Sequence, residues 1–593
     1  MNDERMTRSR YTDAVDRHRP LDVYPNPMLE RASWINLNGI YRYAIVPEGS
    51  PEPTEYEGDI LVPFCVESPL SGVGRPLEPG QTLWYRRTFD APSLAGDERL
   101  ILHFEAVDDR TEVLLNGRSL GIHAGGYEPF SFDVTDRLAP GENVLVAAVS
   151  DPSDAGGQER GKQVLKPGGI WYTATSGIWQ TVWMEVVNAV RVADLVIRPD
   201  YDHAEVGILP KLSCASDARI VLSIRGGDGP IVSADLAEGE FTHVAMPDFV
   251  PWSPERPFLY EIEIDVVSGG RVLDHVRSHF GMRKIALGHD AAGLPRILLN
   301  GRPYFQAGVL DQGYWPDGLL TQPTDQALVD DILAMKALGF NMLRKHIKIE
   351  SRRWYWHCDR LGMLVWQDMP SGGEGALGKW LGAIRPYAFP RLPISDRRYA
   401  RFGRSSESCR TRFLKGLEAM VGRLSCHPSI VCWVPFNEAW GQFDARKTAL
   451  YVRSLDPTRL VDHASGWYDQ KGGDLKSIHR YILAPKAPRP EPRRAFVLSE
   501  FGGYSRLAEG HVWNPRGSFG YRMYPTAAAI TDAYRTLLAE QILPLVGLGL
   551  CATVYTQLSD VELEVNGLLT YDREVVKLDA EVVRFWNEAL KRA

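Results

Sequence analysis

Two glutamates stand at the ends of apolar segments that have the character of buried strands. Glu438 closes the segment "SIVCWVPFNE", and Glu500 closes "RAFVLSE". A strand that is apolar on both faces is typical of a parallel sheet covered on both sides, and it needs no charge at its end. Either glutamate alone could form a salt bridge. Two of them, each followed by a turn-like segment, indicate chemistry.

A pair of carboxyl groups on opposite sides of a pocket suits the cleavage of a glycosidic bond. That reaction requires one neutral acid and one ionised base or nucleophile. The charge of the ionised member raises the pKa of the other and keeps it protonated near neutral pH. One group can then donate a proton while the other attacks.

The chain from residue 286 onward alternates between helical and strand patterns. Thr324 begins a helix with an apolar stripe, and Gly339 ends it before the strand "FNMLR". Ser351 begins the next helix, and Gly362 ends it before "MLVWQDM". Such repeats predict a (β/α)8 TIM barrel over 286–593, in which polar residues at the C-terminal ends of strands face the active-site mouth. A doubly wound sheet is the alternative, but no glycine fingerprint for a nucleotide follows any strand.

The first 285 residues consist of short alternating segments separated by Gly, Pro, Asn and Asp. Period-two alternation with frequent turn signals is typical of antiparallel sandwiches. Asn116-Gly117 in "LNGRSLG" predicts a tight hairpin, because a two-residue turn needs positive φ. We expect one sandwich over 1–190 and a smaller one over 191–285, so the fold class is multidomain, β plus α/β.

Composition narrows the class of partner. The chain has 593 residues and a formal charge of −8, without long runs of Lys or Arg, so a nucleic-acid partner is not indicated. A small neutral or polar molecule fits better.

Two further signals concern redox state and location. Seven cysteines, odd in number and without a CxxC pair, argue against a disulfide framework and a zinc knuckle. The charged N-terminal stretch lacks a secretory apolar region. The apolar run over 542–555 is shorter than the ~18 residues of a membrane span. We therefore expect a cytoplasmic protein that does not insert into membranes.

These segments together carry a resemblance that extends over nearly the whole chain. It resembles glycoside hydrolase family 2, the family of β-galactosidases, β-glucuronidases and β-mannosidases. The motifs are "LWYRRTF", "FEAVDDRTEVLLNGRSLGIHAGGYEPFSFDVT", "SGIWQTVWMEVV", "FGMRKI", "NGRPYFQAGV", "GFNMLRKH", "LGMLVWQDMP", "VPFNEAWG" and "LSEFGG". The resemblance implies a jelly-roll sugar-binding domain, an immunoglobulin-like β-sandwich and a catalytic (β/α)8 barrel, in that order.

The resemblance also implies roles for individual residues. Glu438 would be the acid/base and Glu500 the nucleophile of a retaining mechanism. Asn437 would hydrogen-bond the sugar 2-hydroxyl, and Tyr481 would hold Glu500 in its ionised, oriented form. His479 belongs to the same "HRY" motif, with a strand-end core histidine as the alternative.

A second group of residues is expected to line the sugar pocket. Arg344, His346 and Asp368 follow the second and third barrel strands, and a buried network that supports the glutamates is the alternative interpretation. Tryptophans in loops could stack on sugar faces, although ordinary packing is the better explanation for each one singly. The remaining candidates are Asp311, Gln312, Tyr314 and Gln557, with Trp315, Trp380, Trp440 and Trp467 as the aromatic ones.

Departures from the family pattern bear on specificity. No Asn-x-Lys motif is present, which disfavours glucuronides, and Asp311, Gln312 and Tyr314 stand where the family has an Asn-His-rich stretch. We expect an exo-acting β-glycosidase of neutral sugars, galactosides foremost, with galactofuranosides or arabinofuranosides as the alternative. A long Arg-rich insertion over 371–410 would wall the pocket.

Two other classes of function were weighed. A catalytically silent carbohydrate-binding protein would not need both glutamates. A metal-dependent hydrolase using Asp311, His346, Asp368 and His479 lacks the compact His-x-His or His-Glu-x-x-His spacing. We expect no catalytic metal and no cofactor for the chemistry. A structural magnesium or sodium ion and a homo-oligomeric state stay open.

Overall fold

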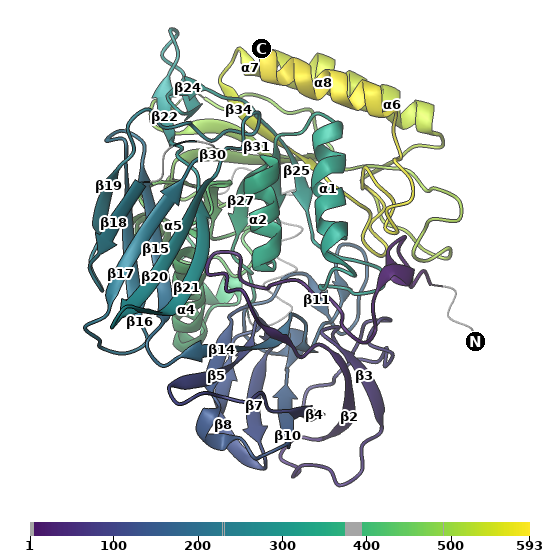
Figure 1. Cartoon of the computed structure of the whole chain (residues 1–593). Coiled ribbons are helices and arrows are strands. Elements are labelled where there is room, and N and C mark those ends of the chain that lie inside the picture. Colours follow the sequence, from purple (N-terminus) through teal and green to yellow (C-terminus); the bar gives the residue numbers. More distant parts are fainter. Residues whose placement is uncertain (1–4, 228, 230–231, 374–393, 490) are drawn as a thin grey trace.

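The computed structural model describes residues 5–227, 229, 232–373, 394–489 and 491–593. Figure 1 shows two β-sandwiches beside a barrel, with the N-terminal sandwich at the bottom and the second sandwich on the left. This arrangement confirms the predicted fold class of two sandwiches and a TIM barrel. Within the described ranges, every helix is too short or too polar to cross a lipid bilayer.

The N-terminal sandwich has two antiparallel sheets. The larger has the order β3-β2-β4-β10-β7-β8, with bounds Gly58–Val62, Gly39–Pro47, Gln81–Asp90, Glu142–Ser150, Arg110–Leu115 and Arg118–Ala124. The smaller has the order β1-β14-β5-β9, with bounds Ile35–Asn36, Val182–Asn188, Glu98–Phe104 and Phe130–Asp133. The predicted hairpin is confirmed between β7 and β8, where Asn116 and Gly117 have φ of 52° and 72°.

Short elements complete this domain. β6 (Val107–Asp108) pairs with β13 (Gly177–Ile178), and β11 (Gln163–Val164) pairs with β12 (Tyr172–Thr173). Single 3-10 turns are η1 (Thr12–Ala14), η2 (Thr135–Arg137) and η3 (Ser153–Ala155). The β11–β12 pair belongs to a loop that leaves the sandwich and reaches the barrel (Figure 1).

The second sandwich packs a three-stranded sheet on a four-stranded one. The first has the order β15-β16-β19, with bounds Val192–Asp200, Glu205–Leu212 and Thr242–Ala245. The second has the order β18-β17-β20-β21, with bounds Val232–Leu236, Arg219–Arg225, Tyr260–Ser268 and Arg271–Phe280. Alternate residues of β20 are buried, which is why its sequence "YEIEIDVVS" has period two.

The barrel is an eight-stranded parallel sheet. Its order is β29-β28-β27-β26-β25-β34-β31-β30, with bounds Leu460–Val461, Ile430–Val434, Leu364–Asp368, Met342–Lys345, Gln306–Asp311, Leu550–Thr556, Ala495–Gly502 and Leu475–Arg480. The seam between β29 and β30 is bridged by the Asp474 amide, which donates to the Val461 carbonyl at 2.8 Å. An antiparallel sheet precedes the barrel, made of β22 (Ile285–His289), β23 (Pro295–Leu299) and β24 (Arg302–Pro303).

Helices cover the barrel from outside. They are α1 (Asp325–Ala337), α2 (Arg352–Leu361), α4 (Glu407–Leu424), α5 (Ala445–Leu455), α6 (Ala527–Thr536), the π-turn η5 (Leu537–Ile542), α7 (Leu543–Val546) and α8 (Ala580–Arg592). Smaller pieces are η4 (Tyr399–Phe402), β32 (Tyr504–Ser505) and β33 (Arg522–Met523). Thr324 caps α1 through the Ala327 amide, as predicted, and Gly362 ends α2 in the left-handed conformation. Ser351 precedes α2, but its hydroxyl makes no capping bond.

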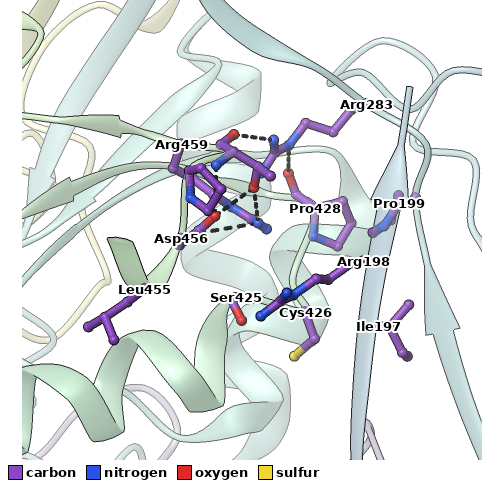
Figure 2. A pocket seen from close by; sticks show the side chains of 13 residues that line it. Ile197, Arg198, Pro199, Arg283, Ser425, Cys426, Pro428, Leu455, Asp456 and Arg459 are labelled. Carbon is purple, nitrogen blue, oxygen red and sulfur yellow. Dashed lines mark hydrogen bonds and ion pairs between the residues drawn. The ribbon is translucent and has the colours of Figure 1, made fainter. Parts of the chain in front are cut away.

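The second sandwich is held on the barrel by a buried arginine. A cavity of about 80 Å³ lies between β15 and the segments that follow α4 and α5. Figure 2 shows the side chains that line it. Arg283 crosses this junction and donates to the carbonyls of Pro428, Thr458 and Ile430 at 2.9, 3.2 and 2.6 Å. These bonds satisfy the backbone at the base of the barrel and fix the domain against it.

All seven cysteines are free, and four of them are buried.

Candidate active site

The structure brings Glu438 and Glu500 together. Glu438 follows β28, and Glu500 lies near the end of β31, so both stand at the C-terminal mouth of the barrel. One carboxylate oxygen of each and Nδ1 of His479 lie within 4.8 Å of one another. Carboxyl groups about 5–5.5 Å apart are typical of retaining glycosidases, whereas inverting ones need roughly 6.5–9.5 Å. The geometry therefore suits direct attack by one carboxylate.

The backbone that presents Glu438 is strained. Glu438 and Ala439 have φ of 48° and 64°, in the left-handed region that costs energy for residues other than glycine. The Glu438 amide donates to the Ser465 carbonyl at 3.0 Å, and the Trp440 amide donates to the Asn437 carbonyl at 2.9 Å. These bonds hold the turn in place.

Glu438 sits in an environment that favours its protonated form. Burial raises the pKa of its carboxyl to about 7, against the opposing charges of Lys162 and Arg344. Its Oε1 lies 2.7 Å from Nδ1 of His479. Burial also lowers the pKa of His479 to about 4, so the imidazole is neutral at pH 7. A protonated Glu438 can therefore donate to Nδ1, while Nε2 faces the Ser465 hydroxyl at 3.1 Å.

Glu500 has the opposite surroundings. Arg344 Nη1 donates to its Oε1 at 3.1 Å, and the Tyr481 hydroxyl donates to its Oε2. A cation and a phenol that both donate to a carboxylate suit the ionised form. Thus one member of the pair is placed to hold a proton and the other to carry a charge.

Arg344 organises three functional side chains at once. Two donors bind Asp368 at 3.0 Å each, one binds the Asn437 Oδ1 at 2.8 Å, one binds Glu500, and one binds the Ser499 carbonyl at 2.9 Å. A guanidinium has five N–H donors, so none remains for a substrate. Of the two interpretations left open by the sequence, the structure favours the supporting network for Arg344 and Asp368.

Asn437 is oriented by the same network. Because its Oδ1 accepts from Arg344, its Nδ2 is turned away, and Nδ2 is buried without a partner among the described residues. The indole N–H of Trp440 is also buried and unpaired in that part of the chain. A buried donor without a partner costs free energy unless a ligand engages it. These two groups are therefore candidate donors to a ligand at this site.

The other predicted residues divide into those that belong to this arrangement, which come first, and those that lie outside it. His346 lies beside Glu500, with Nδ1 3.0 Å from Asp368 Oδ2 and 4.0 Å from Glu500 Oε1. Trp440 faces Trp171 of the N-terminal domain, with ring centroids 5.0 Å apart, and Trp467 is half-buried in the loop after β29. Gln557 accepts from Gln312 and donates to Asn566, at 2.8 Å each.

Three predicted candidates lie outside this arrangement. Asp311 is bound by Lys345 Nζ at 2.7 Å, within a buried cluster that includes Glu350. Trp315 is packed in the core, against Tyr11 and the guanidinium of Arg573. Trp380 and half of the predicted insertion at 371–410 lie outside the described residues.

Sequence reasoning missed the contribution of the N-terminal domain. Lys162 precedes β11, and its charge lowers the pKa of Glu438 and also acts on His346. Glu564, in the loop after β34, raises the pKa of Glu438. Both residues are distant from the catalytic motifs along the chain, and their neighbours carry no pattern that marks them.

Among the described residues, two sets of side chains are close enough to share a metal ion. They are Glu438–His479–Glu500 and His279–Asp359–His427. In the first, the Glu438–His479 contact of 2.7 Å is a hydrogen bond, and in the second both histidines are bonded to Asp359 Oδ2 at 3.1 and 2.6 Å. The ligand atoms in both sets are thus engaged with one another.

Comparison with protein families matches three models in chain order. They are the sugar-binding domain of glycosyl hydrolases family 2 over residues 32–184, a further family 2 domain over 190–283, and the family 2 TIM-barrel domain over 296–495. Together they cover most of the chain.

Individual relatives agree with the family models. The chain is 26% identical over 528 residues to a β-galactosidase of Halalkalibacterium halodurans, covering 80% of this chain and 48% of that protein. It is 23% identical over 477 residues to a putative β-glucuronidase of Formosa agariphila, covering 73% and 52%. The chain thus spans about half the length of these curated relatives.

A solved structure shares the fold along nearly its entire length. It is a β-D-glucuronidase of Dictyoglomus thermophilum, 16% identical, with a TM-score of 0.74 and coverage of 96% of this chain and 99% of that one. The three family models, in the order in which the domains fold, show that the chain belongs to glycoside hydrolase family 2.

Proposed function

We propose that the protein is a retaining, exo-acting β-glycosidase that hydrolyses terminal glycosides through Glu438 and Glu500. The observation that carries the proposal is the pairing of two carboxyl groups with opposite surroundings at one barrel mouth. Glu438 is hydrogen-bonded to a neutral histidine, and Glu500 receives bonds from Arg344 and Tyr481. Retaining glycosidases require one protonated carboxyl group as the acid and one ionised carboxylate as the nucleophile.

In the first step Glu500 attacks the anomeric carbon, and Glu438 gives its proton to the departing oxygen. The glycosidic bond breaks, the alcohol leaves, and the sugar is held as an ester of Glu500. In the second step Glu438, now ionised, takes a proton from water as the water oxygen attacks the same carbon. The ester bond breaks, the sugar leaves with its original anomeric configuration, and both glutamates return to their starting states. This cycle requires no cofactor.

Asn437 would donate its free Nδ2 proton to the sugar 2-hydroxyl. An interaction that strengthens as charge develops on the sugar ring lowers the barrier rather than only tightening binding. The fixed orientation of Asn437 on Arg344 supports this role, because a preorganised donor costs no reorganisation during reaction.

Neutral sugars, β-galactosides first, are the proposed substrates. The chain lacks an Asn-x-Lys motif, and the relative from Halalkalibacterium halodurans carries the name β-galactosidase. Exo action is supported by the N-terminal loop that reaches the barrel, where Trp171 faces Trp440 across the mouth. A pocket narrowed in this way suits the end of a sugar chain.

The test is hydrolysis of p-nitrophenyl glycosides, pyranosides and furanosides of both anomers, by the wild type and by Glu500→Ala. We expect one neutral β-glycoside to be cleaved and the variant to be silent. A furanoside as the single substrate would move the assignment to a furanosidase of the same family. Binding of sugars without cleavage of any glycoside would contradict the proposal and indicate a carbohydrate-binding protein.

A further inference from the structure

A loop of the N-terminal domain places a lysine in the barrel mouth. Gly161 packs so closely on the barrel that a Cβ there would lie 2.9 Å from the Ile347 carbonyl oxygen. The Tyr172 amide donates to the Lys162 carbonyl at 3.0 Å and ties the two arms of the loop together. The backbone around Lys162 is therefore fixed relative to the barrel strands.

The ammonium of Lys162 is buried but weakly bonded. Its side chain is 6% exposed, and Nζ lies 3.4 Å from the Tyr172 hydroxyl oxygen and 3.7 Å from Glu564 Oε2. Both distances exceed the ~2.7–2.9 Å of a charged hydrogen bond. Since an ammonium has three donors, this cation retains donor capacity that the described residues do not use.

Glu564 is the matching acceptor. Its Oε2 accepts from the Tyr172 hydroxyl, and its Oε1 accepts from the Asn566 amide at 2.9 Å. Each carboxylate oxygen can accept more than one bond, so acceptor capacity also remains. The side chain is 2% exposed and is held in one position by these two partners.

The described charges around Lys162 disfavour a further anion there. Arg344 has all five donors engaged, whereas Lys162 keeps spare donors among the described residues and already faces Glu564. A substrate carboxylate beside Lys162 would meet the like charges of Glu564 and Glu500. A hydroxyl group can accept from the ammonium, while its neighbour donates to the carboxylate, at no cost in charge.

We infer that Lys162 and Glu564 form a sugar-binding pair, contributed by two domains, that binds two neighbouring hydroxyl groups of a neutral terminal sugar and discriminates against uronic acids. The inference rests on the proposed function, because it assigns the sugar that Glu438 and Glu500 would act on.

The test is equilibrium binding by titration calorimetry, on the Glu500→Gln background so that no turnover interferes. The probes are galactose, glucose, mannose and arabinose, with galacturonate and glucuronate as the charged counterparts. We expect at least one neutral sugar to bind and both uronates to bind at least about tenfold more weakly. Lys162→Met keeps the length of the side chain and should weaken binding of the neutral sugar about 10- to 100-fold.

The matched control is Lys166→Met, which removes an exposed lysine of the same loop and should leave binding unchanged. Should Lys162→Met fail to fold, Glu564→Gln provides the second variant. It removes the negative charge at constant shape and should shift the preference toward uronates.

Three results would contradict the inference that Lys162 and Glu564 form a sugar-binding pair. They are tighter binding of a uronate than of every neutral sugar, unchanged binding by Lys162→Met, and binding of none of the six sugars. Hydrolysis of glycosides together with unchanged binding in Lys162→Met would reject the pair and leave the proposed function standing. Lys162-dependent binding without hydrolysis of any glycoside would support the pair and reject the proposed function.

Discussion

Two buried clusters in this molecule both combine histidine with carboxyl groups, but the two clusters differ in protonation state. Glu438, His479 and Glu500 meet at the barrel mouth, and His279, Asp359 and His427 meet where the second sandwich joins the barrel. At the mouth, burial lowers the pKa of His479 to about 4 and raises that of Glu438 to about 7. At pH 7 that histidine is neutral, and its acid partner is still partly protonated.

At the domain junction the charges survive burial. Burial opposes the charge of His427, yet Cys426 and Asp359 outweigh it and raise the pKa of the imidazole to about 10. Asp359 accepts from His427 and His279 at 2.6 and 3.1 Å and from the Ser429 amide at 3.0 Å. The two histidines lower the pKa of Asp359 against the effect of burial.

The difference lies in the number of donors around each carboxylate. Asp359 is surrounded by donors on both oxygens, which stabilises its charge and builds a structural ion pair. Glu438 has a single side-chain partner at 2.7 Å, and that partner is neutral. A carboxyl group with so few donors keeps its proton and can give it to a substrate. The following predictions separate catalytic from structural roles.

The largest effect is expected for Glu500→Ala, because no neighbouring group replaces a missing nucleophile. Turnover should fall on the order of 10⁴-fold or more. Initial rates on the best p-nitrophenyl glycoside measure the loss. The exposed Glu509→Ala serves as the matched control and should keep full activity.

Loss of the acid should depend on the leaving group. Glu438→Ala should slow substrates with poor leaving groups by roughly 10²–10⁴-fold and p-nitrophenyl substrates much less, since only the former need a proton. Comparison of kcat/KM across aryl and alkyl glycosides measures this. Equal losses on both kinds of substrate would remove the acid role from Glu438.

At the junction, Asp359→Asn should lower stability and spare the chemistry. Removing one partner of a buried ion pair leaves the other charge uncompensated, at a cost of roughly 3–5 kcal/mol in the free energy of unfolding. Urea denaturation measures that loss, and kcat/KM of the folded protein should stay within about twofold of the wild type. Asp532→Asn breaks an exposed pair with Arg535 and should change stability by less than ~1 kcal/mol.

The smallest effects are expected in pH profiles. The proposed mechanism needs the proton of Glu438, so kcat/KM for poor leaving groups should decline as pH rises above about 7. Glu438→Ala should remove that decline. If the wild-type profile stays flat from pH 6 to 9, Glu438 is not the group that donates the proton.

The junction should respond to pH through stability instead. The folded-state pKa of His427 is raised to about 10, above an unfolded value of ~6.5. Its contribution to the free energy of unfolding is therefore complete below pH ~6.5. It is lost as pH rises through about 10. Unfolding midpoints measured across pH 6–10 should fall in the wild type and change less in His427→Gln.

Much of this architecture could be predicted from local signals. Thr324 marks the start of α1 because a threonine can accept from an amide three residues on, and Gly362 marks the end of α2 because glycine tolerates positive φ. Asn116-Gly117 fixes the β7–β8 register for the same reason. Glu438 and Glu500 were identifiable because a charge at the end of an apolar strand is unusual.

The remainder depends on tertiary contacts that no local pattern encodes. Lys162 reaches the mouth only because Gly161 lets its loop pack on the Ile347 carbonyl. The role of Arg344 follows from a count of five acceptors around its guanidinium, which come from three other strands and their following loops. The sequence gives neither distance nor donor count, so it left the role of Arg344 open and missed Lys162.

The measurement that tests the central claim most directly is the stereochemistry of the product. Proton NMR of the hydrolysis of a β-glycoside substrate, read in the first minutes, identifies the anomer that is formed before mutarotation. The separation of Glu438 and Glu500 within 4.8 Å predicts the β-anomer first, with the α-anomer appearing later. Initial release of the α-anomer would show inversion and contradict attack by Glu500.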